Sequence, residues 1–201
     1  MTYNEILDEL RAKLGDSAEE NNKILREEAV RYAEEGNLDG VKATGELMLE
    51  NMTPEQKAEV ERLTHVDGVR LDELNNKINK MLNEKKVLEA KPLAERLYKK
   101  IIVDFKETEK EKYVSLRNPF EDNLCQLYYK YDKTLTRTPF DFAAYITTYA
   151  YILTETGSPL DAIPVLEKAI DYNPVDCGPR FELAEVFKLL GNRSEERRVG
   201  K

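Results

Sequence analysis

A short stretch near the C-terminus repeats its small and large apolar residues after 34 positions, and this period constrains the fold more than any other feature of the chain. A small residue, a large apolar residue and a glycine recur in the same order, first as Ala150, Leu153 and Gly157 and then as Ala184, Phe187 and Gly191. Periods of roughly 20–50 residues are typical of supersecondary units that bury their apolar faces only by stacking on one another. We therefore expect helix hairpins that pack side by side.

The residues between the two copies resemble the tetratricopeptide repeat (TPR) of bacterial proteins, over roughly residues 143–191. The first-helix positions of that pattern are filled by Ile146, Tyr149, Ala150 and Leu153, and the second-helix positions by Ala162, Leu166, Ala169 and Pro174. The resemblance implies an α-solenoid of antiparallel helix hairpins in which the small residues Ala150 and Ala162 let the two helices approach closely. It also implies a non-catalytic scaffold or adaptor that binds a protein or peptide, whose identity the sequence does not give.

In this family one face of the first helix lines a concave groove, and the resemblance therefore implies which residues meet the partner. The predicted groove residues on the two first helices are Thr147, Tyr151, Thr154, Phe181, Glu185 and Lys188. Tyr149 lies two residues before Tyr151 and is expected to pack inside the repeat. The register thus predicts that Tyr149 is buried and that Tyr151 and Phe181 are partly exposed.

Helix starts elsewhere in the chain follow one pattern, in which a capping residue is followed three positions later by an acid or amide. Thr2, Ser17, Thr53, Asn118, Thr138 and Ser158 all fit it, the last four with proline at the first helical position. The pattern and the apolar spacing predict an all-α fold without strands. The predicted helices are 3–14, 18–35, 38–51, 54–64, 68–90, 93–114, 119–132, 139–156, 159–172 and 177–190, with Pro92 separating the fifth from the sixth.

These helices divide into a helical N-terminal region with longer helices, 1–117, and the TPR-like repeats, 118–192. The segment 193–201 has no apolar face and resembles translated adapter sequence, so we expect a non-native tail. Glu196 and Gly200 occupy positions where the second helix of the next repeat needs an alanine and a large residue. We therefore expect that the array is cut within a repeat and that the complete gene product continues.

The formal net charge of −8 argues against general nucleic-acid binding, which needs clustered cations. Residues 66–118 are the exception, with 13 basic and 10 acidic side chains. The two kinds of charge are interleaved, which favours a solvated helix surface with local ion pairs. The alternative is a helical regulator that binds nucleic acid through 66–118 and uses the repeats to sense a peptide.

No motif in the chain points to catalysis, to a metal or to a cofactor. His65 is the single histidine, and Cys125 and Cys177 are isolated thiols without metal-ligand spacing. The remaining enzymatic hypotheses are a catalytic His65–Cys125 pair and a catalytic pair of carboxylates. The sequence shows neither a secretory leader nor an apolar stretch long enough to cross a bilayer, which predicts a cytoplasmic protein. The oligomeric state stays open.

Overall fold

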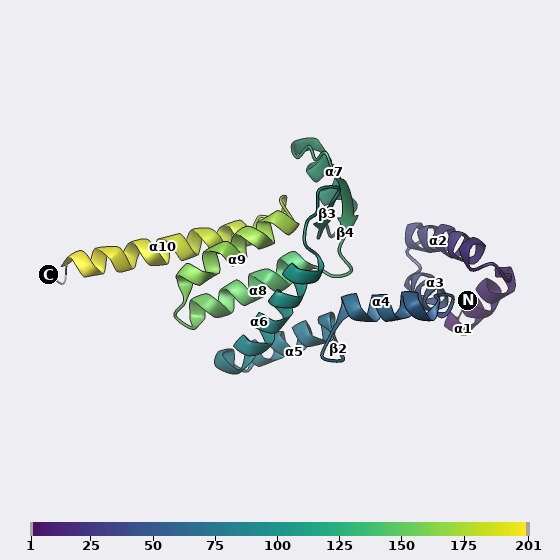
Figure 1. Cartoon of the computed structure of the whole chain (residues 1–201), viewed down its shortest axis with the longest axis horizontal. Coiled ribbons are helices and arrows are strands. Elements are labelled where there is room, and N and C mark those ends of the chain that lie inside the picture. Colours follow the sequence, from purple (N-terminus) through teal and green to yellow (C-terminus); the bar gives the residue numbers. More distant parts are fainter. Residues whose placement is uncertain (1, 200–201) are drawn as a thin grey trace. The chain divides into compact units, whose positions relative to one another are not determined.

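The chain forms two compact units, residues 1–63 and 64–201, in a computed structural model that describes the backbone of residues 2–199 and the side chains of residues 2–191 (Figure 1). Helices make up most of both units, which confirms the predicted helical class, but the second unit also contains short strands that were not predicted. None of the helices within the described residues is both long and apolar enough to cross a membrane. The predicted segment 193–201 lies outside the residues whose side chains are described.

The first unit consists of α1 (Tyr3–Lys13), α2 (Ala18–Glu34), α3 (Leu38–Glu50) and most of α4 (Pro54–Thr64). Helix α3 packs against both α1 and α2. Their apolar faces meet in one core, formed by Ile6, Leu7, Leu10, Leu25, Tyr32, Ala43 and Leu47. Helix α4 buries none of its side chains.

The close contact between α2 and α3 depends on a glycine. A Cβ atom on Gly40 would lie 2.2 Å from the Tyr32 ring, far inside van der Waals contact. The Tyr32 ring therefore lies directly on the α3 backbone, where any side chain would displace it. Asn37 caps the same helix by accepting a hydrogen bond from the Gly40 backbone N–H at 3.0 Å.

The second unit begins with a small antiparallel hairpin, β1 (His65–Val66) and β2 (Val69–Arg70). Asp67 and Gly68 form its turn with positive φ angles of 51° and 74°, as a two-residue hairpin of this twist requires. The hairpin leads into α5 (Leu71–Asn83) and α6 (Val87–Asp104). A β–α–β segment follows, made of β3 (Glu111–Val114), α7 (Pro119–Tyr128) and β4 (Thr134–Arg137), and its two strands pair in parallel.

The last three helices are α8 (Phe142–Glu155), α9 (Pro159–Tyr172) and α10 (Gly178–Val199). Helices α5, α6, α8, α9 and α10 pack consecutively, each against the next, and α10 also contacts α8 (Figure 1). The β3–α7–β4 segment is an insertion between the second and third helices of this stack. The predicted boundary at 117/118 falls inside this unit, because α6 packs on α8 and β3 pairs with β4 across it.

The prediction for residues 68–114 was wrong in its boundaries and in its last element. Helix α5 ends at Asn83 and Lys85 adopts a left-handed φ of 59°, so the helix break precedes Pro92 by several residues. Pro92 is the sixth residue of α6, where its ring removes only one helical hydrogen bond. The helix ends at Asp104, and residues 111–114 form β3 because they pair with residues 134–137. Such a long-range pairing leaves no local period to recognise.

Other helix ends also differ from the predictions. Helix α7 ends at Tyr128, because Tyr129 is extended and both it and Tyr131 pack on the cluster of Val114, Leu116 and Cys125. Helix α8 begins at Phe142 under an Asp141 cap, and not after Thr138. Ser158 occupies the N-cap position of α9 as predicted, with Pro159 as the first residue, but its side chain does not make the predicted capping bond. The predicted caps at Thr2, Ser17, Thr53 and Asn118 are confirmed.

Candidate functional site

Helices α8 and α9 present the pattern of burial that the 34-residue period predicts. Tyr149 is 8% exposed and packs its ring 5.2 Å from that of Tyr98 on α6. Ala150 and Ala162, the small residues of the two helices, are both buried. Gly157 ends α8 with a φ of 84°, a conformation that glycine adopts without strain. The side chains expected to fill the hairpin therefore lie inside it.

The six predicted groove residues lie on two helices in mutual contact, three on α8 and three on α10. Tyr151 is 43% exposed and Phe181 is 70% exposed. Thr147 and Thr154 are half-buried, and their hydroxyls donate back to carbonyl oxygens of their own helix at 2.7 and 3.1 Å. The two hydroxyls are thus hydrogen-bonded within the helix, and the exposed rings of Tyr151 and Phe181 are the larger groups that a partner can contact.

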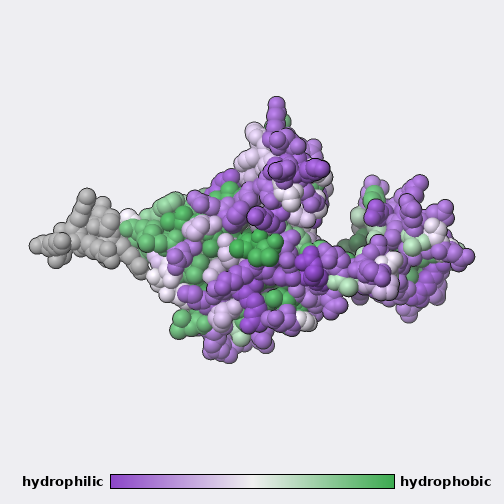
Figure 2. Space-filling view, viewed as in Figure 1, coloured by the Kyte–Doolittle hydropathy of each residue, from purple (hydrophilic) through white to green (hydrophobic). Residues whose placement is uncertain are grey.

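The α10 part of the surface is the more polar one. Glu185 and Lys188 are exposed and face one another as an ion pair at 3.4 Å. Figure 2 shows apolar patches over α9 and α10 beside polar surface. Exposed ion pairs contribute little energy, so this pair forms a polar edge of the surface and is not expected to anchor a partner strongly.

The second copy of the repeat is buried less completely than the first. Ala184 and Phe187, which correspond to Ala150 and Leu153, are exposed, whereas the two α8 residues are buried. Helix α8 is covered by α6, α9 and α10, while α10 packs on α9 and α8 within the described residues. The difference in burial follows from this difference in neighbours.

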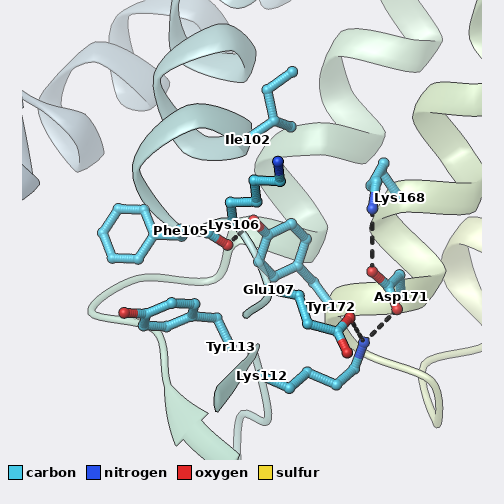
Figure 3. A pocket seen from close by; sticks show the side chains of 9 residues that line it. All are labelled: Ile102, Phe105, Lys106, Glu107, Lys112, Tyr113, Lys168, Asp171 and Tyr172. Atoms are coloured by element: carbon cyan, nitrogen blue, oxygen red, sulfur yellow. Dashed lines mark hydrogen bonds and ion pairs between the residues drawn. The ribbon is translucent and has the colours of Figure 1, made fainter. Parts of the chain in front are cut away.

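A pocket of about 290 Å³ lies at the junction of α6, β3 and α9, and the sequence analysis did not predict it (Figure 3). Its aromatic walls are Phe105, Tyr113 and Tyr172. The Tyr172 hydroxyl donates to the carbonyl oxygen of Phe105 at 2.9 Å, and burial raises the pKa of this phenol. The remaining lining residues are Ile102, Lys106, Glu107, Lys112, Lys168 and Asp171.

Lys112 is the charged centre of this pocket and is only 5% exposed. Its ammonium group contacts the carboxylates of Asp171 and, at 3.2 Å, Glu107 (Figure 3). Burial opposes protonation, but these two carboxylates outweigh it and raise the pKa of Lys112. The lysine therefore stays charged and fully paired. It joins β3 to α9 and is not available as a nucleophile.

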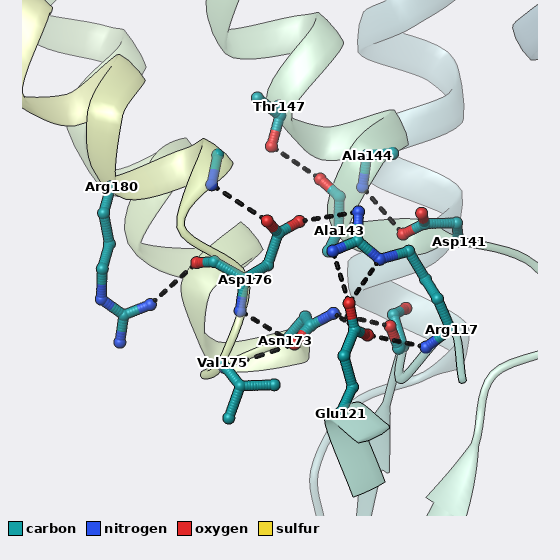
Figure 4. A network of polar contacts seen from close by, with 12 residues as sticks. Arg117, Glu121, Asp141, Ala143, Ala144, Thr147, Asn173, Val175, Asp176 and Arg180 are labelled. Carbon is teal, nitrogen blue, oxygen red and sulfur yellow. Dashed lines mark hydrogen bonds and ion pairs between the residues drawn. The ribbon is translucent and has the colours of Figure 1, made fainter. Parts of the chain in front are cut away.

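A polar network joins the inserted segment to the turn between α9 and α10 (Figure 4). Asn173 is fully buried, and its side-chain amide donates to the carbonyl oxygen of Ser115 at 3.0 Å and to the Glu121 carboxylate at 2.9 Å. Arg117 binds Glu121 from the other side, with Nε 2.7 Å from Oε1. Burial raises the pKa of Glu121, but the contacts with Arg117 and Asn173 outweigh this and lower it.

The residues considered for catalysis are separated in the fold. His65 lies in the β1–β2 hairpin with Nδ1 3.0 Å from the Thr64 hydroxyl oxygen, whereas Cys125 lies on the inner face of α7. Cys125 is buried, and burial raises the pKa of its thiol, which disfavours the nucleophilic thiolate. Cys177 is a second free thiol and is exposed. Among the described residues, no group of three or more His, Cys, Asp or Glu side chains is placed to hold a metal ion.

Comparison of the chain with protein-family models, with curated proteins and with solved structures finds no match. The candidate site therefore rests on the geometry above, and the TPR assignment stays a prediction.

Proposed function

We propose that this protein is a non-catalytic, cytoplasmic binding module of the TPR type, and that α8 and α10 present an aromatic surface to a peptide or protein. The observation that carries the proposal is the contrast between two neighbouring tyrosines. Tyr149 is buried against α6, while Tyr151, two residues later on the same helix, is 43% exposed. Because the first helices of successive repeats present the same face, Phe181 on α10 would extend the exposed surface begun by Tyr151 on α8.

Exposed aromatic side chains suit this role because they bury a large area at a small loss of conformational freedom. Phe181 is 70% exposed, although a phenylalanine ring gains about 1.5–3 kcal/mol when it is fully buried. Aromatic residues are also among the commonest anchors of protein interfaces. The Glu185–Lys188 pair beside Phe181 gives the surface the polar border that such anchors usually have.

The alternative function, nucleic-acid binding through residues 66–118, has less support. Several lysine and arginine side chains in this segment have described contacts, and most of these contacts are ion pairs with carboxylates. Examples are Lys86 with Glu84 at 2.6 Å, Lys99 with Glu95 at 2.6 Å and Arg96 with Asp67 at 2.6 Å. Phosphate binding would have to replace these ion pairs, and the paired carboxylates would repel the phosphates.

The experiment that tests the proposal selects ligands from a random peptide library on the immobilised protein and measures their affinity by fluorescence polarisation. Tyr151→Ala and Phe181→Ala are each expected to weaken the selected peptides by about 1–2 kcal/mol, or roughly five- to thirty-fold. Phe120→Ala is the matched control, because Phe120 on α7 is 69% exposed and lies outside the surface.

Two results would contradict the proposed binding surface, and a third would contradict the non-catalytic role. One is a library selection that yields no peptide dependent on either aromatic residue. The other is an equal loss of affinity in Phe120→Ala and Phe181→Ala, which would place the binding elsewhere. A turnover activity abolished by a single side-chain change would refute the non-catalytic role.

A further inference from the structure

Helix α7 carries an apolar stripe that no other described element covers to any large extent. Phe120, Leu127 and Tyr128 are 69%, 68% and 72% exposed, and Leu124 between them is half-buried. The spacing of four, three and one residues places all four on one side of a helix. The buried residues Glu121 and Cys125 lie on the adjacent side of the helix, next to Tyr128, and hold α7 on the rest of the fold. The exposed fractions of Phe120, Leu127 and Tyr128 therefore show that the stripe faces outward.

The surroundings of this α7 stripe are close to electrically neutral, although the chain as a whole has a net charge of −8. Asn123 and Gln126 are its exposed uncharged neighbours on the helix. The two carboxylates of α7 are both engaged, Glu121 with Arg117 at 2.5 Å and Asp122 with Arg137. Two copies of an acidic chain repel one another over most of their surface. The α7 stripe is a place where they can approach without bringing unpaired carboxylates together.

We propose that the α7 stripe is a self-association surface, on which a second copy of this chain packs its own α7 in the antiparallel direction. The positions of the stripe support a twofold arrangement, because Phe120 and Tyr128 lie equally far in sequence from Leu124. With the axis at Leu124, the Phe120 ring of each copy meets the Tyr128 ring of the other. Such isologous contacts, in which one patch meets itself, are the commonest form of homodimer.

The exposed area predicts a weak dimer. An aromatic side chain carries roughly 150–250 Å², so Phe120 and Tyr128 together expose on the order of 300 Å². With Leu127 the two copies would remove on the order of 800 Å² from water, below the roughly 1,200–2,000 Å² of stable complexes. The association should therefore be reversible and visible only at high protein concentration.

Sedimentation velocity of the whole chain tests this surface. The protein is examined from about 10 μM to about 1 mM, where small interfaces associate. A reducing agent is present, because Cys177 is exposed and could cross-link two chains. We expect reversible dimerisation that strengthens with salt, since salt screens the repulsion between acidic chains.

Matched variants locate the contact. Leu127→Asp should raise the dimer dissociation constant at least about ten-fold, whereas Leu160→Asp, in α9, should change it less than about two-fold. Leu127 and Leu160 are 68% and 67% exposed, so the two variants differ in position and not in exposure. Phe120→Ala is a second test that adds no charge, and Phe181→Ala is its control. Both leave the core intact, which far-UV circular dichroism verifies.

A chain that stays monomeric over the whole concentration range overturns the proposal. So does a dimer that Leu127→Asp and Phe120→Ala leave unchanged, because another surface would then form it. The peptide-binding experiment above depends on Phe181 and not on Phe120, so either proposal can fail while the other stands.

Discussion

Replacement of Asn173 by alanine should destabilise the second unit more than any exposed substitution, because this buried amide serves four partners at once. Its Nδ2 atom donates to the Ser115 carbonyl oxygen and to Glu121, and its Oδ1 atom accepts from the backbone N–H groups of Val175 and Asp176. The bond to the charged carboxylate contributes about 1.5–3 kcal/mol, and each of the other three about 0.5–1 kcal/mol. Asn173→Ala is therefore expected to lower the free energy of unfolding by about 3–6 kcal/mol.

Hydrogen exchange measured by mass spectrometry is the suitable assay, because the chain has two compact units and one global unfolding curve would mix them. A loss of about 4 kcal/mol corresponds to a roughly thousand-fold faster exchange of the slowest amides. The acceleration should appear in 111–128 and 142–182 and be absent from the first unit, 1–63. Asn79→Ala, at an exposed position of α5, is the control and should change stability by less than about 0.5 kcal/mol.

An isosteric variant separates hydrogen bonding from packing. Asn173→Asp keeps the shape of the side chain but places a second carboxylate where the amide lies 2.9 Å from the Glu121 carboxylate. It should destabilise the unit at least as much as alanine at neutral pH, because like charges meet in a buried site. A loss below about 1 kcal/mol in both variants, or faster exchange confined to 1–63, would refute the assigned role of Asn173.

Three further predictions follow from the burial and ion pairing of other residues in the second unit. Ala162→Leu should overpack the α8–α9 interface, where Ala162 is fully buried, and lower the free energy of unfolding of the second unit by about 1–3 kcal/mol, measured by hydrogen exchange. Unchanged exchange in 142–172 would contradict the placement of the repeat. Tyr149→Ala should lower the free energy of unfolding of the second unit by about 3–5 kcal/mol and Tyr151→Ala clearly less, since only the first ring is buried. Hydrogen-exchange rates that rank the two variants in the opposite order would refute the register. The folded state lowers the pKa of Glu121, so the stabilisation from its carboxylate is present above the ordinary glutamate pKa of about 4.3 and is lost as pH falls through the lowered value. Glu121→Gln should therefore weaken the fall in stability that the protein shows below about pH 5. A fall in stability that the variant leaves unaltered would exclude Glu121 as its source.

The sequence was most informative where structure depends on neighbours along the chain. Thr2, Ser17 and Asn118 cap their helices as predicted, because a capping side chain reaches an N–H only two or three residues away. The positions of α8 and α9 were predictable for a related reason. A buried helix face repeats every three or four residues, so Tyr149 and Tyr151 lie on different faces, and the repeat register predicted which of the two is buried.

The candidate binding surface was only partly accessible to sequence reasoning. Tyr151 and Phe181 were found because the repeat register orients them, and both are exposed. The pocket around Lys112 was missed, since its lining comes from three segments between Ile102 and Tyr172 that carry no common motif. The α7 stripe was missed for a different reason. Phe120, Leu127 and Tyr128 have the spacing of a core face, and only the fold shows that the neighbouring face, with Glu121 and Cys125, is the buried one.

The sequence by itself therefore determined the helical class, several helix starts and the register of the α8–α9 hairpin, all of which depend on interactions within a few residues. The tertiary structure decided the rest. It interrupts the stack with the β3–α7–β4 insertion, pairs Lys112 with Asp171, and buries Asn173 beside Ser115 and Glu121. Each of these features joins residues that lie more than 20 positions apart, and their partners are selected by the free energy of the whole packed unit and not by any local pattern.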